Sequence, residues 1–195
     1  NTLDSLSFVS EFSTEIIIVD NSSTDDTIDV ITRAKKPHNL IALRQNVGFG
    51  AAVNEAASRS QGRFLVILNP DACIETSVES ALELMEERPS IGVVGGIMRG
   101  TSGNFRPSAG RFPVFLDFLF PSRMYYPPIS LQHCCLGDSS WRKVDWIEGS
   151  LWLVRRSSFL EVGGFDEHYF LYVEDIDLCR RFTESGYTNL QIIDL

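Results

Sequence analysis

Basic residues are scarce in this sequence and form no run. The chain has 17 Lys and Arg against 26 Asp and Glu, which gives a net charge of -9 and a pI near 4.8. That balance argues against a nucleic-acid backbone as the main partner. The most apolar window, residues 113–121, is shorter than the roughly 20 residues of a membrane span and contains Asp117. Because 44% of the residues are hydrophobic, we expect a folded globular protein.

Cysteine is also rare, and no two cysteines have the C-x-x-C spacing. A bond between adjacent Cys134 and Cys135 would be strained. We therefore expect a reducing compartment with buried or idle thiols, the others being Cys73 and Cys179. A zinc site is the alternative, and the spacing of His133 and His168 does not favour it.

Residues 15–98 alternate between strand-like and helix-like segments. Apolar runs predict strands at 15–19, 39–43, 63–68 and 91–94. Helices are expected from the capping residues 22–26 to about residue 36, over 48–60, and from a capping box at Thr76–Glu79 to Arg88. Repeated β-α-β crossovers indicate an α/β fold, a mostly parallel sheet with helices on both faces.

The pattern changes after residue 98. Residues 99–143 are irregular and rich in Gly, Pro and aromatics, which is typical of a functional loop region. Regular structure resumes with a strand at 150–155 and helices at 156–162 and 174–185. A helix-like start at 3–9 and a strand-like end at 190–195 suggest a single domain, 1–195, that is truncated at both ends.

Two aspartates follow strand-like runs. Asp20 ends the first run, and Asp71 follows the third across Asn69-Pro70. If both strands are neighbours in one parallel sheet, the two carboxylates share one crevice, and a metal-bound phosphate ligand would relieve their repulsion. Helix capping near Asp20 and an ordinary turn at Asp71 are the simpler alternatives.

Glycines open the second helical segment, in Asn46-Val-Gly48-Phe-Gly-Ala-Ala-Val-Asn54. A helix N-terminus suits phosphate, but close helix packing explains Gly50 and the alanines equally well. Asn46 and Asn54 are harder to dismiss, since packing requires neither.

Acidic residues also begin the last helix. Glu174, Asp175 and Asp177 follow the apolar residues 170–173, so one of them could be a partly buried general base. Stabilisation by the helix dipole, or pairing with Arg180 and Arg181, is the alternative. Upstream, the segment 145–150 sets Trp146 beside Glu148 and Gly149, which suits a sugar, although a core tryptophan is as good an interpretation.

Five motifs in this order resemble the family 2 glycosyltransferases, which have the GT-A fold, a Rossmann-like arrangement. They are Ile-Val-Asp20-Asn-Ser-Ser-Thr-Asp; residues 46–54; Leu-Asn-Pro-Asp71; residues 149–156; and Gly-Gly-Phe-Asp-Glu with residues 172–180. The Asn-Pro-Asp form and the block 165–170 are most similar to the rhamnosyltransferase-like branch, which builds cell-surface polysaccharides.

The resemblance implies a role for each site residue. Asp175 would be the catalytic base, and Asp71 would meet Mg²⁺ or Mn²⁺ on the donor diphosphate. The nucleotide sugar would contact residues from three segments, Asp20, Asn21, Asn46, Gly48, Asn54, Asn69 and Asp71. The acceptor would meet Trp146, Glu148, Gly149 and Glu174.

The implied reaction is an inverting sugar transfer from a nucleotide-diphosphate sugar, dTDP-rhamnose first and a UDP sugar second, to a glycan or lipid-linked acceptor. The resemblance also implies a cytoplasmic location and peripheral association with the inner face of the membrane. A catalytically inactive nucleotide-sugar-binding module and a nucleotidyltransferase are the alternatives.

The sequence departs from the family pattern in three ways. The opening strand that ends in Thr-Tyr-Asn is absent, Asn69 replaces the first acid of the Asp-x-Asp motif, and the family's downstream histidine would lie beyond Leu195. We therefore expect weak activity or none from the isolated chain.

Overall fold

The computed structural model describes residues 2, 6, 13–125 and 141–192. Its first half contains β1 (Ile17–Asp20), α2 (Thr27–Thr32), β2 (Asn39–Ala42), α3 (Phe49–Arg59), β3 (Phe64–Leu68), α4 (Glu79–Glu87) and β4 (Ile91–Gly96). Three two-residue strands follow, β5 (Met98–Arg99), β6 (Phe105–Arg106) and β7 (Ala109–Gly110), and then two 3-10 turns, η2 (Phe115–Phe118) and η3 (Pro121–Met124). The last part contains β8 (Trp141–Val144), β9 (Trp146–Ile147), β10 (Leu151–Arg155), α5 (Arg156–Glu161), α6 (Glu174–Glu184) and β11 (Thr188–Ile192).

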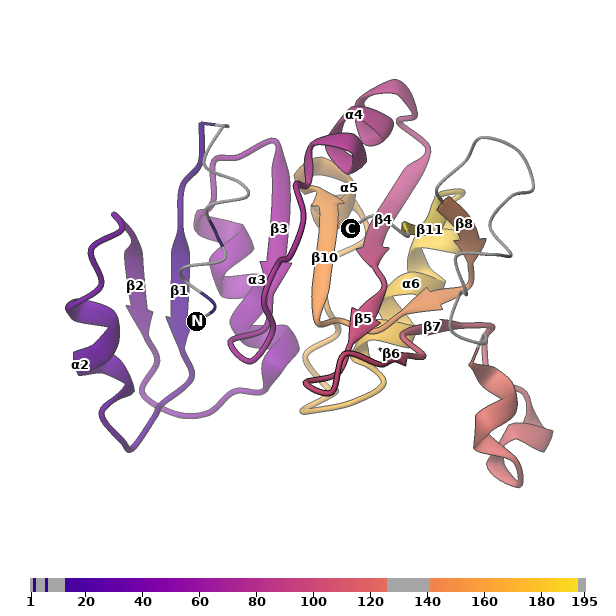
Figure 1. Cartoon of the computed structure of the whole chain (residues 1–195), viewed down its shortest axis with the longest axis horizontal. Helices are drawn as coiled ribbons and strands as arrows, with labels where there is room; N and C mark the ends of the chain where they lie inside the picture. The colour runs from indigo at the N-terminus through magenta and orange to yellow at the C-terminus, as the bar shows by residue number, and fades with distance from the viewer. Residues whose placement is uncertain (1, 3–5, 7–12, 126–140, 193–195) are drawn as a thin grey trace.

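The central sheet has five strands in the order β3-β10-β4-β11-β8 (Figure 1). β10 runs antiparallel to both of its neighbours, β11 runs parallel to β4, and β8 runs antiparallel to β11. The expectation of a mostly parallel sheet is therefore wrong for this sheet, which is mixed. The physical reason is that β10 returns from the long excursion 97–150 and needs no helical crossover to enter antiparallel.

β1 and β2 form a separate parallel pair, with Asp20 opposite Ala42. Within the described part of the chain β1 has no hydrogen-bonded ladder with β3, so the two strands are not the sheet neighbours that the sequence suggested. Helix α3 packs against β1. The carboxyl ends of β1, β3 and β4 nevertheless lie along one edge, the lower edge in Figure 1.

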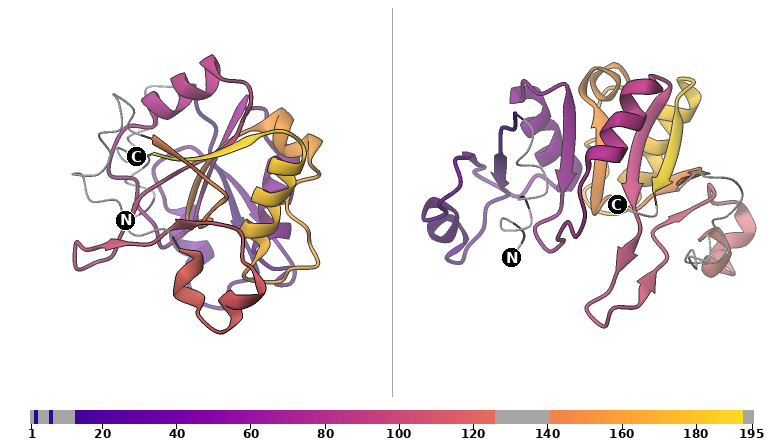
Figure 2. Two further views of the ribbon diagram at one scale, coloured as in Figure 1. Left: turned by 90° about the vertical axis from the view of Figure 1, so that its right-hand side faces the viewer. Right: turned by 45° about the horizontal axis from the view of Figure 1, so that its top comes forward.

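Helices cover both faces of the central sheet, as expected. Alternate residues of β10 enter two different cores, because successive strand side chains point to opposite faces. Trp152 and Val154 join side chains of α3, α5 and α6, whereas Leu151 and Leu153 join side chains of α4. In the right-hand view of Figure 2, α4 lies in front of the sheet, with α5 and α6 behind it.

Most expected elements are present, with shorter ends. The capping box at Thr76 is wrong: α4 begins only at Glu79, preceded by buried Val78, and the Glu79 amide donates to Ser77 Oγ at 3.2 Å. The irregular region 99–143 contains the three short strands and two 3-10 turns. The predicted helix at 3–9 and the Cys134-Cys135 pair lie outside the described residues.

Two smaller expectations concern thiols and membranes. Cys73 is exposed and Cys179 is buried, and both are free thiols. None of the helices in the described ranges is long and apolar enough to cross a membrane.

Candidate functional site

The pairing of β10 with β3 builds the candidate site at one end of the sheet. Leu151 at the start of β10 lies opposite Leu68 at the end of β3. One step further on, the Asn69 amide donates to the Ser150 carbonyl at 3.1 Å. The turn 69–71 therefore lies beside the turn 148–150, although 80 residues of sequence separate them.

Asp175 stands in the first turn of α6, next to that second turn. A Cβ placed on Gly149 would lie 3.7 Å from the Asp175 Cβ and 3.7 Å from the Phe49 ring. Gly149 therefore lies between the side chains of Asp175 and Phe49. Three distant segments of the chain, 49, 149 and 175, meet at this point.

Burial raises the pKa of Asp175 from 3.8 to about 6. The carboxylates of Glu174 and Glu148 push it in the same direction, while the amides of Ile176 and Gly149 oppose the shift. Glu174 is only 7% exposed, and burial raises its pKa as well. A carboxyl group with a pKa near 6 can accept a proton near neutral pH, as a general base must.

The backbone just before Asp175 is strained. Tyr172 and Val173 have φ of 68° and 74°, in the left-handed region where a β-branched residue is an outlier. The residues before them contact the glycine loop: Phe49 N donates to the Phe170 carbonyl at 3.3 Å. Strained backbone of this kind clusters at binding and catalytic sites.

Asp20 is buried at the carboxyl end of β1, with 4% of its surface exposed. Its Oδ2 accepts from the Ser23 amide at 3.1 Å, while its buried Oδ1 has no hydrogen-bond donor among the described residues. A buried carboxylate oxygen without a donor is costly, which marks it as a position for a ligand N–H or O–H.

Asn21 and Asn46 shape the loop before α3. Asn21 Oδ1 accepts from the Val47 amide at 2.9 Å and its Nδ2 donates to the Gly48 carbonyl at 3.1 Å. Asn46 Oδ1 accepts from the Gly48 amide at 3.0 Å. Both side chains hold the loop in place, and their contact with a nucleotide stays a prediction.

Gly48 and Asn54 have structural roles that the sequence did not reveal. Gly48 has φ of +90°, and a Cβ on it would lie 2.5 Å from the Phe170 carbonyl oxygen. Asn54 Oδ1 accepts from the Phe165 amide and its Nδ2 donates to the Phe165 carbonyl, both at 2.9 Å. The premise that packing does not require Asn54 is wrong, because this amide clamps Phe165, a buried core residue.

The turn after β3 offers oxygen ligands to a cation. Asp71 is exposed, and the buried Asn69 Oδ1 has no hydrogen-bond donor among the described residues. No group of three or more His, Cys, Asp or Glu that could hold a metal exists in the described ranges. The donor set therefore fits a hard cation such as Mg²⁺ or Mn²⁺ held jointly with substrate phosphates, and it does not fit a metal site made of protein alone.

Trp146 does not face the site as a sugar platform. It is 2% exposed, its Nε1 donates to the Arg111 carbonyl at 2.8 Å, and its ring packs edge-on against Tyr125. The proposed acceptor contact of Trp146 is thus corrected to a core role. Glu148 and Gly149, on the same turn, remain beside Asp175.

Both arginines of α6 are engaged within the fold. Arg180 pairs with Glu184 at 2.8 Å. Arg181 pairs with Asp177 and donates to the Val162 and Gly164 carbonyls at 2.7 and 2.6 Å. The expected pairing with the acids at the start of α6 therefore holds for Arg181, whereas Arg180 pairs with an acid at the end of the helix.

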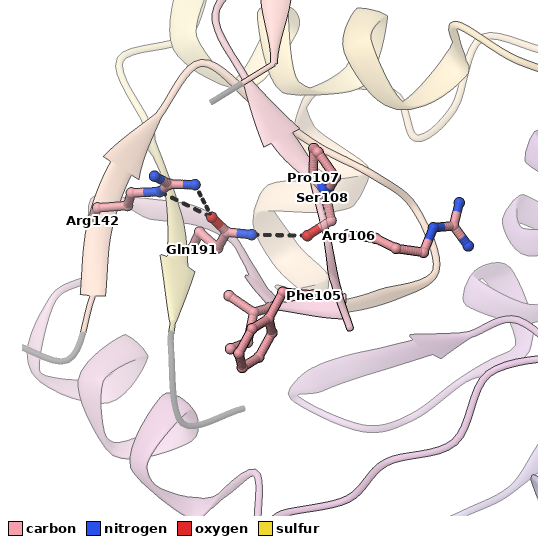
Figure 3. A pocket seen from close by; sticks show the side chains of 7 residues that line it. Phe105, Arg106, Pro107, Ser108, Arg142 and Gln191 are labelled. Atoms are coloured by element: carbon pink, nitrogen blue, oxygen red, sulfur yellow. Dashed lines mark hydrogen bonds between the residues drawn. The ribbon is translucent and has the colours of Figure 1, made fainter. Parts of the chain in front are cut away.

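A chain of polar contacts links Arg142, Gln191 and Ser108 (Figure 3) and continues to the turn 148–150. Arg142 donates to Gln191 Oε1, and Gln191 Nε2 donates to Ser108 Oγ at 2.9 Å. The Ser108 carbonyl in turn accepts from the Glu148 amide at 2.8 Å. The cavity beside this chain, about 10 Å³, holds no more than a water molecule.

A larger hollow, about 370 Å³, is lined by Ile17 of β1, residues 38–41 around β2, and Arg59 of α3. Asp20 is not among its lining residues.

Sequence reasoning missed the partners that hold the site together. Phe165 packs against Phe49, Trp152 and Phe159, and Phe170 supplies the carbonyl that meets Gly48. The sequence signal for these contacts was Gly50 with the neighbouring alanines, which predicts close helix packing without identifying the partner. That partner is Phe165, whose Cβ would lie 2.8 Å from a Cβ placed on Gly50.

Comparisons with known proteins agree with this arrangement. A family model described as Glycosyl transferase family 2 matches residues 1–148. The N-acetylglucosaminyl-diphospho-decaprenol L-rhamnosyltransferase of Mycobacterium tuberculosis is 30% identical over 97% of this chain and 67% of its own length. The O-antigen chain rhamnosyltransferase WbaN of Salmonella anatum is 28% identical over 89% of this chain and 52% of its own.

Among solved structures, GalNAc-T7 with UDP, GalNAc and Mn²⁺ matches 98% of this chain and 39% of its own, with a TM-score of 0.73 and 14% identity. At that identity the likeness speaks for the fold alone, and the expected GT-A fold is confirmed. The chain thus spans two thirds or less of the length of these proteins.

Replacing Gly48 by alanine should disturb the loop before α6. Gly103→Ala is the matched control, because Gly103 also has a positive φ (+79°) but open space where a Cβ would be. Both variants carry backbone strain, whereas only the Gly48 variant meets the Phe170 carbonyl. We expect Gly48→Ala to lose about 1–3 kcal/mol more unfolding free energy in urea than the control. Equal losses would mean that the contact with Phe170 is not needed.

Asp175 should make stability fall as pH rises. Its pKa is 3.8 without the protein environment and about 6 in the fold, so the unfolded chain releases this proton first. The contribution of Asp175 to the free energy of unfolding is complete below about pH 4. It falls by about 3 kcal/mol at most up to about pH 6 and is constant above that pH. Asp175→Asn removes this decline, so its unfolding free energy relative to wild type should rise between about pH 4 and pH 7. The exposed Asp29→Asn control should track wild type; if Asp175→Asn does so too, the raised pKa is refuted.

Proposed function

Because the chain belongs to glycosyl transferase family 2, we propose that it transfers a sugar from a nucleotide-diphosphate sugar to a glycan or lipid-linked saccharide, with inversion at the anomeric carbon. The observation that carries this proposal is the position of Asp175. It is a partly buried carboxyl group with a pKa of about 6, beside the turn 148–150 and at the edge where β3 ends. The match to the family model disfavours a nucleotidyltransferase.

In the proposed mechanism Asp175 accepts the proton of the acceptor hydroxyl as that oxygen attacks the anomeric carbon. On the opposite face of the sugar, the bond between the anomeric carbon and the diphosphate oxygen breaks and the diphosphate leaves. The anomeric configuration is therefore inverted. Glu174 and Glu148 keep the pKa of Asp175 raised, so that it binds the proton at the moment of attack. Gly149 leaves room for the acceptor hydroxyl beside the carboxylate.

The donor nucleotide is proposed to lie along the carboxyl end of β1 and the amino end of α3. The free Oδ1 of Asp20 would accept a hydrogen bond from the base or ribose. Asn21, Asn46 and Gly48 would form the wall of this pocket through the loop that they hold, and Asn54 would support it through Phe165. Rhamnose is the proposed sugar, with dTDP-rhamnose as the donor, since both curated relatives named above are rhamnosyltransferases.

A divalent cation is proposed to bind at Asp71 and the amide oxygen of Asn69, together with the donor diphosphate. When bound, it would stabilise the charge on the leaving diphosphate. Mn²⁺ is named with the solved structure of GalNAc-T7, and Mg²⁺ suits one carboxylate plus phosphates equally well.

The proposed acceptor is a lipid-linked or growing glycan of cell-surface polysaccharide synthesis, used at the cytoplasmic face of the membrane. The name of the M. tuberculosis relative contains a diphospho-decaprenol acceptor.

We also propose that residues 1–195 belong to one domain with an irregular loop region at 99–143.

Asp175→Asn is the direct test of this function. The amide keeps the shape of the side chain but cannot take the proton, so transfer should fall by roughly 10²- to 10⁴-fold. Donor affinity, measured by calorimetry with dTDP-rhamnose and UDP sugars, should not change, and the exposed Asp29→Asn control should transfer normally. The assays use the longest natural form of the protein that contains these 195 residues. Unchanged transfer would show that Asp175 is not the base, and donor binding without transfer in wild type would favour the binding-module alternative.

Asp71→Ala should remove the effect of metal on donor binding. In wild type, Mn²⁺ or Mg²⁺ should raise the melting temperature in the presence of the donor above that with donor and EDTA, because the cation joins the protein to the diphosphate. The Asp71 variant should melt alike in both conditions. A variant with exposed Glu75→Ala in the same loop should behave as wild type. An intact metal effect in the Asp71 variant would rule this residue out as a ligand.

A further inference from the structure

An apolar projection extends from the body of the molecule between β7 and β8. It consists of residues 113–124, which hold the two 3-10 turns η2 and η3, and we call it the knob. It lies at the lower right of Figure 1 and at the far right of the right-hand view of Figure 2. Five of its apolar side chains are at least half exposed: Val114 52%, Phe115 83%, Leu116 52%, Leu119 69% and Phe120 55%. Such a cluster is unusual on the surface of a soluble protein and marks an interaction site.

The only acid of the knob is turned away from this surface. Asp117 is 4% exposed, and its carboxylate accepts from the Val114 amide at 2.7 Å and from Arg111 Nη2 at 2.5 Å. These two contacts hold its pKa below the usual range, so it stays charged and paired inside the knob. The outer surface of the knob therefore carries no negative charge of its own.

Charge in this part of the chain is opposite to that of the whole. Residues 97–125 contain four arginines and one acid, a net +3 in a chain of net -9. The arginines are Arg99, Arg106, Arg111 and Arg123. Arg111 is paired with Asp117, so Arg123 is the exposed charge on the knob itself. A cation beside exposed aromatic and aliphatic side chains is the combination that binds anionic lipid headgroups and acyl chains.

The base of the knob is fixed to the acceptor side of the candidate site. The Arg111 carbonyl accepts from Trp146 Nε1, and the Phe112 amide donates to Asp145 Oδ2 at 2.9 Å. At the other end of the knob, the Met124 carbonyl accepts from the Arg111 amide at 2.9 Å. The turn that follows Trp146 carries Glu148 and Gly149. An external surface to which the knob binds would therefore also fix the orientation of that turn relative to the surface.

We propose that the knob docks into the headgroup region of an anionic lipid membrane through Phe115, Leu119 and Phe120. Its internal hydrogen bonds and ion pair order these side chains before contact, which lowers the entropic cost of binding. The role of this docking in presenting a lipid-linked acceptor to Asp175 rests on the function proposed above, whereas the docking itself does not.

Vesicle co-sedimentation tests the docking without any substrate. Wild-type protein should bind vesicles of phosphatidylcholine and phosphatidylglycerol, and bind pure phosphatidylcholine at least tenfold more weakly. The triple variant Phe115→Ser, Leu119→Ser, Phe120→Ser should bind the mixed vesicles at least tenfold more weakly than wild type. Arg123→Gln should reduce the preference for phosphatidylglycerol.

The control variant carries Val30→Ser and Leu160→Ser, at two exposed apolar positions on α2 and α5. It should bind vesicles as wild type does, and unfolding in urea should show that both variants are folded. Absence of wild-type binding to the mixed vesicles, or equal binding by the triple variant, would overturn the proposal. So would sedimentation equilibrium showing a dimer that the triple variant dissociates, because the knob would then be an interface between two copies.

The Asp175→Asn variant separates this proposal from the catalytic one. It should bind vesicles as well as wild type while losing sugar transfer. Failure of the catalytic proposal would therefore leave vesicle binding intact, and failure of docking would leave donor binding and the effect of Asp175→Asn intact.

Discussion

The rest of the structure depends on the position of β10 between β3 and β4. This strand enters antiparallel to both neighbours and contributes to both hydrophobic cores. Its first residues continue the ladder into the hydrogen bond between Asn69 and Ser150. Without this strand the candidate metal turn after β3 and the turn that borders Asp175 would have no common frame. The mixed direction of the sheet is thus a requirement of the site.

Two halves of the chain meet at this frame through close contacts that tolerate little change. The half that ends with α3 supplies Gly48 and Phe49, and the later half supplies Gly149, Phe170 and Asp175. Glycine is needed at 48 because a side chain there would overlap the Phe170 carbonyl. The strained backbone at Tyr172 and Val173 lowers the stability of the fold at this junction. Tyr172 and Val173 are themselves exposed. The segment is held on one side by the hydrogen bond from Phe49 to Phe170 and on the other by α6, which begins directly after Val173.

Burial has opposite uses in the two regions where acids are hidden. At the site, burial raises the pKa values of Asp175 and Glu174, which have no cationic partner among the described residues, and this favours proton uptake. In the knob, hydrogen bonds from the Val114 amide and from Arg111 lower the pKa of buried Asp117 and keep its charge away from the surface. The donors around a hidden carboxyl group therefore decide whether it is reactive or structural. In an acidic chain this difference separates a candidate base from a structural residue.

The sequence by itself determined the α/β class, the positions of β1 to β4, β10, β11 and the helices α2 to α6, and the acids that end β1 and begin α6. These follow from local periodicity, capping residues and helix breakers, which act over a few residues. Its ordered motifs also indicated the family. Only the tertiary structure decided that β10 runs antiparallel, that Trp146 is buried and that Asn54 clamps Phe165. Those outcomes depend on contacts between segments up to about a hundred residues apart, whose energies come from packing and paired hydrogen bonds that no local pattern contains.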